Sequence, residues 1–261
     1  MNLKGLVLFD IDGVIRDVEN SYRLAVKKTV SQFCGWEPNN TEIDHLKSEG
    51  RWNNDWDASL ELIKRYIQKE QLSIKPPDRE NLINAFSKFY FGGDPYGDPK
   101  HWEGFIKDEP LLVSKSFFEK LTHQNIGWGF VSGAEIPSAK FVLEKRIGLI
   151  KPPLSAMGDA PEKPDPTGLI KLSSQLYSEP LGLGMPPISY LGDTVADVLT
   201  IQRARAECPK QKFISLAVAP PHLHNKKSLS DRKAYEQRLK DAGADTILQS
   251  TSEILQLPFS C

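Results

Sequence analysis

The chain lacks the features that mark secreted, membrane-spanning and nucleic-acid-binding proteins. Its 261 residues include three cysteines, far apart and odd in number, which fit neither a disulfide framework nor a zinc site. No apolar run approaches the ~18 residues needed to cross a bilayer, and the first residues lack the apolar segment and cleavage site of a signal peptide. A formal net charge of −1 argues against electrostatic binding to nucleic acid. We therefore expect a cytoplasmic protein that binds neither membranes nor nucleic acids.

What the chain does have is an alternation of strand-like and helix-like segments. Short runs typical of strands cover residues 5–10, 127–131, 188–191, 213–218 and 244–248. Apolar residues at helical spacing predict helices over residues 114–124, 136–147 and 167–177. Strands that alternate with helices indicate an α/β fold with a parallel sheet.

Residues 18–108 differ from the rest because they show helical patterns and no convincing strand. The first helix predicted there ends at Gly35, a residue that favours the left-handed conformation of a helix C-cap. This helical block interrupts the α/β pattern directly after the first strand. We therefore expect a core domain of residues 1–17 and 109–261, with an inserted α-helical domain of residues 18–108.

Polar side chains follow the predicted strands of the core. Asp10 and Asp12 come directly after the first apolar run, and Ser132 and Asp193 follow two later strands. Ligands of open α/β sheets bind where the carboxyl ends of the strands meet, so these residues should converge in one crevice. Carboxylates are costly to desolvate unless they are paired or bound to a metal. Carboxylate oxygens are ligands that Mg²⁺ prefers, so we expect this ion at the site.

Neutral and positive groups complete this predicted site. Lys163 would add a fixed positive charge for a phosphoryl oxygen, and the Ser132 hydroxyl and Gly133 amide would supply neutral donors. Phosphoryl transfer requires this combination of positioning and charge neutralisation. The pattern indicates Mg²⁺-dependent phosphoryl chemistry with Asp10 as the nucleophile.

Four short segments, in this order, resemble the four motifs of the haloacid dehalogenase superfamily. They are Asp10-Ile11-Asp12-Gly13-Val14, Val131-Ser132-Gly133, Lys163-Pro164 and Gly192-Asp193-Thr194-Val195-Ala196-Asp197. The resemblance extends over nearly the whole chain. The insertion is similar to the helical cap of the phosphoglycolate-phosphatase-like branch, subfamily IA. The resemblance implies a Rossmann-like parallel sheet with an inserted helical cap that closes over the site.

The same resemblance implies a role for each catalytic position. Asp10 would attack phosphorus and become an aspartyl phosphate. Asp12 would protonate the leaving alcohol and then activate water. Ser132 and the Gly133 amide would hold the phosphoryl oxygens, and Lys163 would neutralise charge on Asp10 and the phosphoryl group.

The metal ligands are implied in the same way. Mg²⁺ would be held by the Asp10 carboxylate, the Asp12 backbone carbonyl and Asp193. Asp197 would act as a second acidic partner, either through water or by fixing Lys163. Without a metal, Asp193 and Asp197 would also suit the N-cap and first turn of a helix.

Asp12 distinguishes between branches of the superfamily that the other motif residues do not separate. Similar dehalogenating and phosphonate-cleaving proteins lack an acid at this position, so its presence favours a phosphatase or a phosphomutase, which share the four motifs. We expect hydrolysis of a small phosphorylated metabolite by a monomer or homodimer. A phosphomutase on the same scaffold is the first alternative, and a non-catalytic metabolite-binding or regulatory protein is the second.

Three further residues are candidates for substrate binding. Arg16 follows the first motif and could face the substrate or be a solvated side chain. Arg51 and Asn54 lie in a polar loop of the insertion that could contact the leaving group. The alternative for this loop is a helix-capping turn with Trp52 packed on the core.

Overall fold

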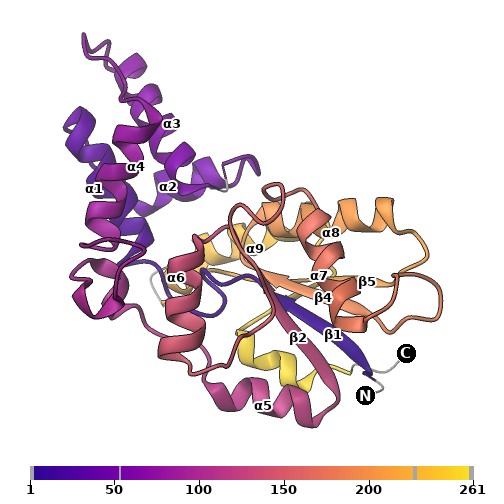
Figure 1. The fold of residues 1–261 in the computed structure, drawn as a ribbon. Helices are drawn as coiled ribbons and strands as arrows, with labels where there is room; N and C mark the ends of the chain where they lie inside the picture. Colours follow the sequence, from indigo (N-terminus) through magenta and orange to yellow (C-terminus); the bar gives the residue numbers. More distant parts are fainter. Residues whose placement is uncertain (1–2, 53, 226–227, 259–261) are drawn as a thin grey trace. The chain divides into compact units, whose positions relative to one another are not determined.

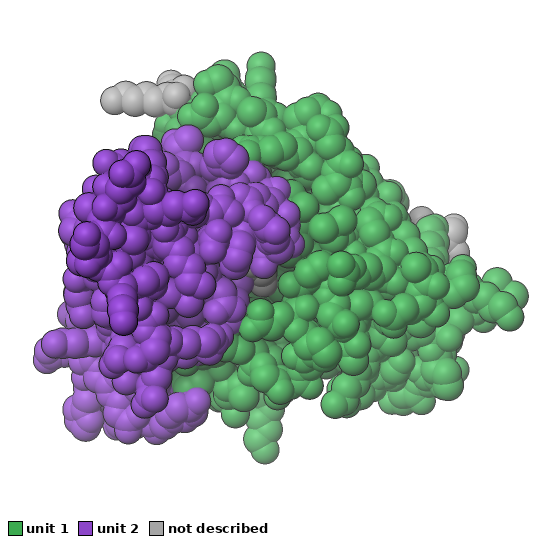
Figure 2. Space-filling view, turned by 90° about the horizontal axis from the view of Figure 1, so that it is seen from above, with its two compact units in different colours: residues 1–17, 111–261 green, residues 18–110 purple. Residues whose placement is uncertain are grey.

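The computed structural model describes residues 3–52, 54–225 and 228–258. The chain divides into two compact units, which are coloured separately in Figure 2. The core unit comprises Met1–Asp17 and Leu111–Cys261, and the inserted unit comprises Val18–Pro110.

A six-stranded, all-parallel sheet forms the centre of the core unit (Figure 1). Its strands are β1 (Gly5–Phe9), β2 (Ile126–Val131), β3 (Leu154–Ser155), β4 (Ile188–Gly192), β5 (Phe213–Val218) and β6 (Thr246–Leu248). Their order across the sheet is β3-β2-β1-β4-β5-β6, so β1 lies between β2 and β4. The predicted fold class, a Rossmann-like parallel α/β sheet, is confirmed.

Helices cover both faces of this sheet because alternate residues of a strand point to opposite sides. They are α5 (Lys115–His123), α6 (Ile136–Lys140), α7 (Thr167–Tyr177), α8 (Val195–Glu207) and α9 (Leu229–Asp241), with the shorter segments η3 (Phe141–Arg146), η4 (Pro221–Leu223) and η6 (Thr251–Gln256). Val7 and Phe9 of β1 belong to the apolar cluster that includes α5, η3 and η6. Leu6 and Leu8 belong to the opposite cluster, which α7 and α8 complete.

The inserted unit is helical, and α1 packs against α3 and α4. Its elements are α1 (Tyr22–Cys34), α2 (Asn40–Lys47), α3 (Asp55–Lys69), α4 (Arg79–Tyr90), η1 (Pro99–His101) and η2 (Phe105–Asp108). The ring centroid of Tyr22 lies 4.0 Å from that of Tyr90 and 5.4 Å from that of Phe86. Gly35 ends α1 with φ 74°, as predicted from its lack of a Cβ atom.

The observed strands and helices differ from the predicted ones at several places, of which three bear on the site or on the larger helices. The two-residue strand β3 and the eight-residue helix α2 were not predicted, because neither is long enough to display a period. The helix predicted over residues 136–147 is α-helical only as far as Lys140 and continues as the π-helix η3. In the part of the chain that the structure describes, no helix combines the length and apolar character that a bilayer crossing requires.

Candidate active site

The predicted strand-end residues gather at one edge of the sheet. Asp10 directly follows β1, Ser132 follows β2 and Asp193 follows β4. The register pairs Phe9 at the end of β1 with Phe130 on one side and Leu191 on the other. The three strands therefore end almost level, and the residues that follow them lie side by side, as parallel pairing requires.

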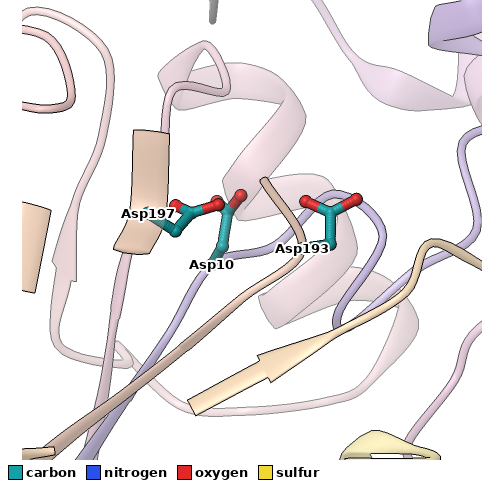
Figure 3. A group of neighbouring side chains, drawn as sticks. All are labelled: Asp10, Asp193 and Asp197. Carbon is teal, nitrogen blue, oxygen red and sulfur yellow. The ribbon is translucent and has the colours of Figure 1, made fainter. Parts of the chain in front are cut away.

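Three buried aspartates form the centre of the site. One carboxylate oxygen from each of Asp10, Asp193 and Asp197 lies within 4.8 Å of the others. Figure 3 shows the carboxylates of Asp10 and Asp197 next to one another, with Asp193 beyond Asp10. Their exposed fractions are 6%, 8% and 1%, so water screens their charges little.

Lys163 joins two of these aspartates. Its Nζ lies 3.1 Å from Asp10 Oδ1 and 2.6 Å from Asp197 Oδ1, and it donates to the Tyr190 hydroxyl at 2.9 Å. Burial alone would lower the pKa of Lys163, but the charges of Asp10 and Asp197 raise it well above its usual value. The lysine is therefore a permanent cation inside the site.

The two aspartates bonded to Lys163 differ in their pKa. Burial raises the pKa of Asp10 to about 6, although Lys163 opposes this shift and Asp197 adds to it. Burial would raise the pKa of Asp197 as well, but there the charge and hydrogen bond of Lys163 and the bonds from Thr194 outweigh it and lower the pKa. Asp197 is thus the firmly ionised partner, and Asp10 is the carboxylate with the more basic oxygen.

Asp197 reaches this position because it also begins a helix. Its Oδ2 accepts hydrogen bonds from the backbone N–H of Thr194 at 3.0 Å and from the Thr194 hydroxyl at 2.6 Å. The Thr194 side chain and Asp197 form a capping box at the start of α8. Asp197 therefore lies in the first turn of α8, as one interpretation predicted, and binds Lys163 with its other oxygen, while its role beside a metal stays a prediction. The N-cap of α8 is Thr194, so the interpretation of Asp193 as the N-cap is wrong.

Two glycines allow the carboxylates to approach the backbone. Gly13 has φ 75°, and a Cβ atom there would lie 2.1 Å from Asp193 Oδ2. A Cβ atom on Gly192 would lie 2.2 Å from the Cβ atom of Asp197. Any larger residue at either position would displace an aspartate of the cluster.

Tyr190 belongs to the site although the sequence did not indicate it. Its buried hydroxyl lies 2.8 Å from the Val131 carbonyl oxygen and 2.9 Å from Asp197 Oδ1, and it accepts the bond from Lys163. The available signal was a tyrosine hydroxyl within the buried strand β4, beside a second hydroxyl on Ser189. Such a tyrosine commonly finds a local partner, so its type alone does not point to catalysis.

The predicted phosphate-binding loop starts at the end of β2. The backbone N–H of Ser132 donates to the Ser155 carbonyl oxygen of β3 at 2.9 Å, and the Ser132 hydroxyl accepts from the Ala134 N–H at 3.2 Å. Ser132 is buried, and Gly133 is half-buried. The short strand β3 thus fixes the backbone from which both predicted donors project.

Asp12 and Arg16 form an ion pair next to this cluster. The Nε of Arg16 lies 2.6 Å from Asp12 Oδ1. The Asp12 side chain is 24% exposed and the Arg16 side chain 0%. The solvated alternative for Arg16 is therefore wrong, and its contact with substrate stays a prediction.

The other two substrate candidates lie in the inserted unit. The Asn54 side chain accepts hydrogen bonds from the backbone N–H groups of Trp56 and Asp57 at 3.0 and 3.3 Å, so it caps α3, as the alternative interpretation predicted. The exposed Arg51 pairs with Glu49 at 3.1 Å and lies over the half-buried Trp52 ring. A contact of Arg51 or Asn54 with substrate stays a prediction.

The donor set of the aspartate cluster suits a hard divalent cation. Asp10, Asp193 and Asp197 offer buried carboxylate oxygens, which Mg²⁺ prefers over nitrogen or sulfur. Lys163 offsets part of their negative charge, and a divalent cation would offset the rest. Both oxygens of Asp197 already accept hydrogen bonds, so Asp10 and Asp193 are the better candidates for direct ligands.

Comparisons with known proteins identify the family of the chain. The sequence model of the haloacid dehalogenase-like hydrolase family matches residues 5–205. Imidazoleglycerol-phosphate dehydratase from Phytophthora nicotianae is 28% identical over 256 residues, which make up 96% of this chain and 52% of that protein. The chain thus spans about half the length of this curated relative.

Two solved structures illustrate the likeness in fold. Phosphatase Tt82 from Thermococcus thioreducens is 21% identical, with a TM-score of 0.57 over 90% of this chain and 99% of its own. CbbY from Rhodobacter sphaeroides, solved in complex with phosphate, is 14% identical, with a TM-score of 0.63 over 98% of this chain and 100% of its own. At these identities the likeness concerns the fold alone.

Proposed function

The chain belongs to the haloacid dehalogenase-like hydrolase family, and from this premise we propose that it is a Mg²⁺-dependent phosphatase. Its substrate would be the phosphate monoester of a small metabolite, and Asp10 would carry the phosphoryl group. The observation that supports this proposal most directly is the position of Asp10. It follows β1, is buried beside two other aspartates, and has Lys163 Nζ 3.1 Å from its Oδ1.

The reaction would proceed in two displacements at phosphorus. In the first, an Asp10 oxygen bonds to phosphorus, the bond from phosphorus to the ester oxygen breaks, and Asp12 transfers its proton to the departing oxygen. In the second, Asp12 takes a proton from water, the water oxygen bonds to phosphorus, and the bond from phosphorus to Asp10 breaks. Asp12 regains its proton in the second step, so the cycle releases one alcohol and one phosphate.

The surroundings of Asp10 support its role as a nucleophile. Burial raises its pKa to about 6, which makes its carboxylate oxygen more basic than that of an ordinary aspartate. Lys163 opposes this shift and so favours the ionised carboxylate near neutral pH. The fixed charge of Lys163 would also neutralise the negative charge that builds up on the phosphoryl group during transfer.

Mg²⁺ would be held by the carboxylates of Asp10 and Asp193 and by the Asp12 backbone carbonyl, with Asp197 as a supporting acid. The ion would supply charge neutralisation for the phosphoryl oxygens and for the clustered carboxylates. Ser132 and Gly133 would donate hydrogen bonds to the same phosphoryl group. The inserted unit would act as a cap that excludes bulk water from the site.

The relative from Phytophthora nicotianae suggests one member of the substrate panel. Its name states that it acts on imidazoleglycerol phosphate, the phosphate ester of an imidazole-bearing polyol. We include this compound among sugar phosphates and amino-alcohol phosphates, because all carry a small polar leaving group. The identity of the alcohol depends on groups beyond the aspartate cluster.

The decisive experiment measures phosphate release from this panel and from 4-nitrophenyl phosphate, with Mg²⁺ and with EDTA. We expect Mg²⁺-dependent turnover that Asp10→Asn reduces to below about a thousandth of the wild-type rate. Asp231→Asn, which alters an exposed aspartate of α9, is the matched control and should keep full activity.

Three outcomes would overturn the proposal. Turnover that Asp10→Asn leaves unchanged would exclude the aspartyl phosphate. Interconversion of sugar phosphate isomers with little phosphate release would indicate a phosphomutase. Thermal stabilisation by a panel compound, without turnover of any compound, would indicate a non-catalytic binding protein.

A further inference from the structure

A buried arginine connects the predicted acid–base residue to the helix that follows the predicted phosphate-binding loop. Arg16 Nε donates to Asp12 Oδ1 at 2.6 Å, and its Nη2 donates to Ser138 Oγ at 2.9 Å. Ser138 lies in α6, the helix that follows the loop of Ser132 and Gly133. We propose that Arg16 is the positioning residue of Asp12, and that it fixes the carboxylate relative to the phosphoryl group. The inference rests on the proposed function.

The backbone explains how Arg16 reaches Asp12. The chain turns sharply after β1, because the N–H groups of Ile15 and Arg16 donate to the Ile11 carbonyl oxygen at 2.7 and 3.2 Å. The Gly13 N–H donates to the Arg16 carbonyl oxygen at 2.9 Å and closes the turn. A residue four positions after Asp12 is thereby brought back beside it.

The contacts of Arg16 fix the orientation of the Asp12 carboxylate and place a positive charge beside it. A guanidinium group is planar, so hydrogen bonds from two of its nitrogens set the orientation of the whole group. With Oδ1 of Asp12 committed to Arg16, Oδ2 remains as the oxygen that exchanges a proton. The Asp12 side chain keeps 24% of its surface exposed, whereas Arg16 keeps none. The arginine therefore holds the carboxylate from its buried side and leaves the other side of Asp12 exposed.

This arrangement has a specific consequence for the reaction. Proton transfer to the leaving oxygen requires Asp12 Oδ2 at hydrogen-bonding distance, and a misplacement of about 1 Å is costly. Esters whose leaving group is a weak base need no such proton. Loss of Arg16 should therefore slow esters with basic leaving groups far more than esters with weakly basic ones.

The test compares phenyl phosphate with 4-nitrophenyl phosphate, two aryl esters that differ mainly in the basicity of the leaving group. In Arg16→Met we expect kcat/KM for phenyl phosphate to fall about 10- to 100-fold, and that for 4-nitrophenyl phosphate about threefold or less. Asp12 also activates water in the second step. The kcat for 4-nitrophenyl phosphate should therefore fall, and phosphorylated protein should accumulate in acid-quenched samples.

Two milder variants keep the test decisive if Arg16→Met does not fold. Arg16→Lys retains the charge without the planar fork, and Ser138→Ala removes the second hydrogen bond of the guanidinium group. We expect each to shift the ratio of the two kcat/KM values in the same direction, by about threefold to tenfold.

The matched control is Arg23→Met in the inserted unit. Arg23 forms an equally short ion pair, 2.6 Å, with the buried Asp44. Its loss should lower stability and leave the ratio of kcat/KM values unchanged. Equal losses for both esters in the Arg16 and Ser138 variants would overturn the inference alone. A wild-type protein that hydrolyses neither ester would instead overturn the proposed function, and the inference with it.

Discussion

The two units each contain a cluster of ion pairs with nearly the same contact lengths in opposite surroundings. In the core unit, Lys163 Nζ lies 2.6 Å from Asp197 Oδ1, and the two side chains are 5% and 1% exposed. In the inserted unit, an Arg65 nitrogen lies 2.7 Å from Glu49 Oε1, and the side chains are 42% and 23% exposed. The distances alone would not distinguish a site from a surface.

The pKa of Asp10, the second aspartate beside Lys163, does distinguish the two clusters. Hydrogen bonds from Arg65, Trp52 and Arg51 lower the pKa of Glu49 to about 2. In the core, burial raises the pKa of Asp10 to about 6 despite Lys163. The exposed Glu49 keeps much of its hydration and gains from its partners. Of the two buried aspartates that contact Lys163, Asp197 also gains bonds from Thr194, whereas Asp10 loses hydration that the shared cation does not replace. The buried cluster therefore contains a carboxylate that is more basic than usual, whereas the exposed cluster connects the segment between α2 and α3 to Arg65 of α3.

The largest expected effect comes from removing the cation of each cluster. Lys163→Met should abolish phosphatase activity and lower the free energy of unfolding by about 3–5 kcal/mol, because it leaves buried carboxylates without their ion-pair partner. Arg65→Met should lower it by less than about 1 kcal/mol, since exposed pairs are weak. Urea unfolding at pH 7 without Mg²⁺ measures both. Similar losses in the two variants would contradict the comparison.

The next effect is a pH dependence that has opposite signs in the two units. Burial raises the pKa of Glu135, which follows the Ser132 loop, from 4.5 to about 7, and its Oε2 is buried without a hydrogen-bond partner. Between these values the folded protein holds a proton that the unfolded chain has released. Stability from this group is therefore complete below pH 4.5 and is lost as pH rises through 7, by about 3 kcal/mol.

Glu135→Gln should remove this loss. The stability of the variant relative to the wild type should therefore be higher at pH 8 than at pH 5. Glu49→Gln is the control with the reverse sign. The lowered pKa of Glu49 gives stability that is present above pH 4.5 and lost as pH falls through about 2. Because Glu49 is partly solvated, that effect should stay below about 1 kcal/mol. Urea unfolding between pH 3 and 8 measures both slopes, and slopes of one sign would refute this assignment.

The smallest effect concerns one hydroxyl group in each unit. Tyr190→Phe removes an acceptor from Lys163 and should cost about 1–2 kcal/mol of stability and lower kcat. Tyr90→Phe removes a similarly buried hydroxyl, which donates to Glu109 at 3.1 Å in the inserted unit. It should cost about as much stability and leave kcat unchanged. Thermal unfolding and phosphate release separate the two, and an equal loss of kcat would place Tyr190 outside the site.

Much of the core fold could be predicted from local patterns. The segments that precede Asp10, Ser132 and Asp193 are strands in the structure. They could be predicted because a short apolar run bounded by polar residues and glycine is typical of a buried strand. The strand β3 escaped prediction because two residues carry no period, although it supplies the carbonyl that holds the Ser132 backbone. In the inserted unit, Asn54 caps α3, a role that its residue type favours.

The polar residues at the ends of the strands, and their order, could be predicted from the chain alone, because that property depends only on neighbours along it. The tertiary structure decided how those residues are paired. It placed Tyr190 and Asp197 on Lys163, and it buried Arg16 between Asp12 and Ser138, which lies 122 positions away from Arg16. Contacts between such distant residues depend on how strands and helices pack, and no local pattern records that packing.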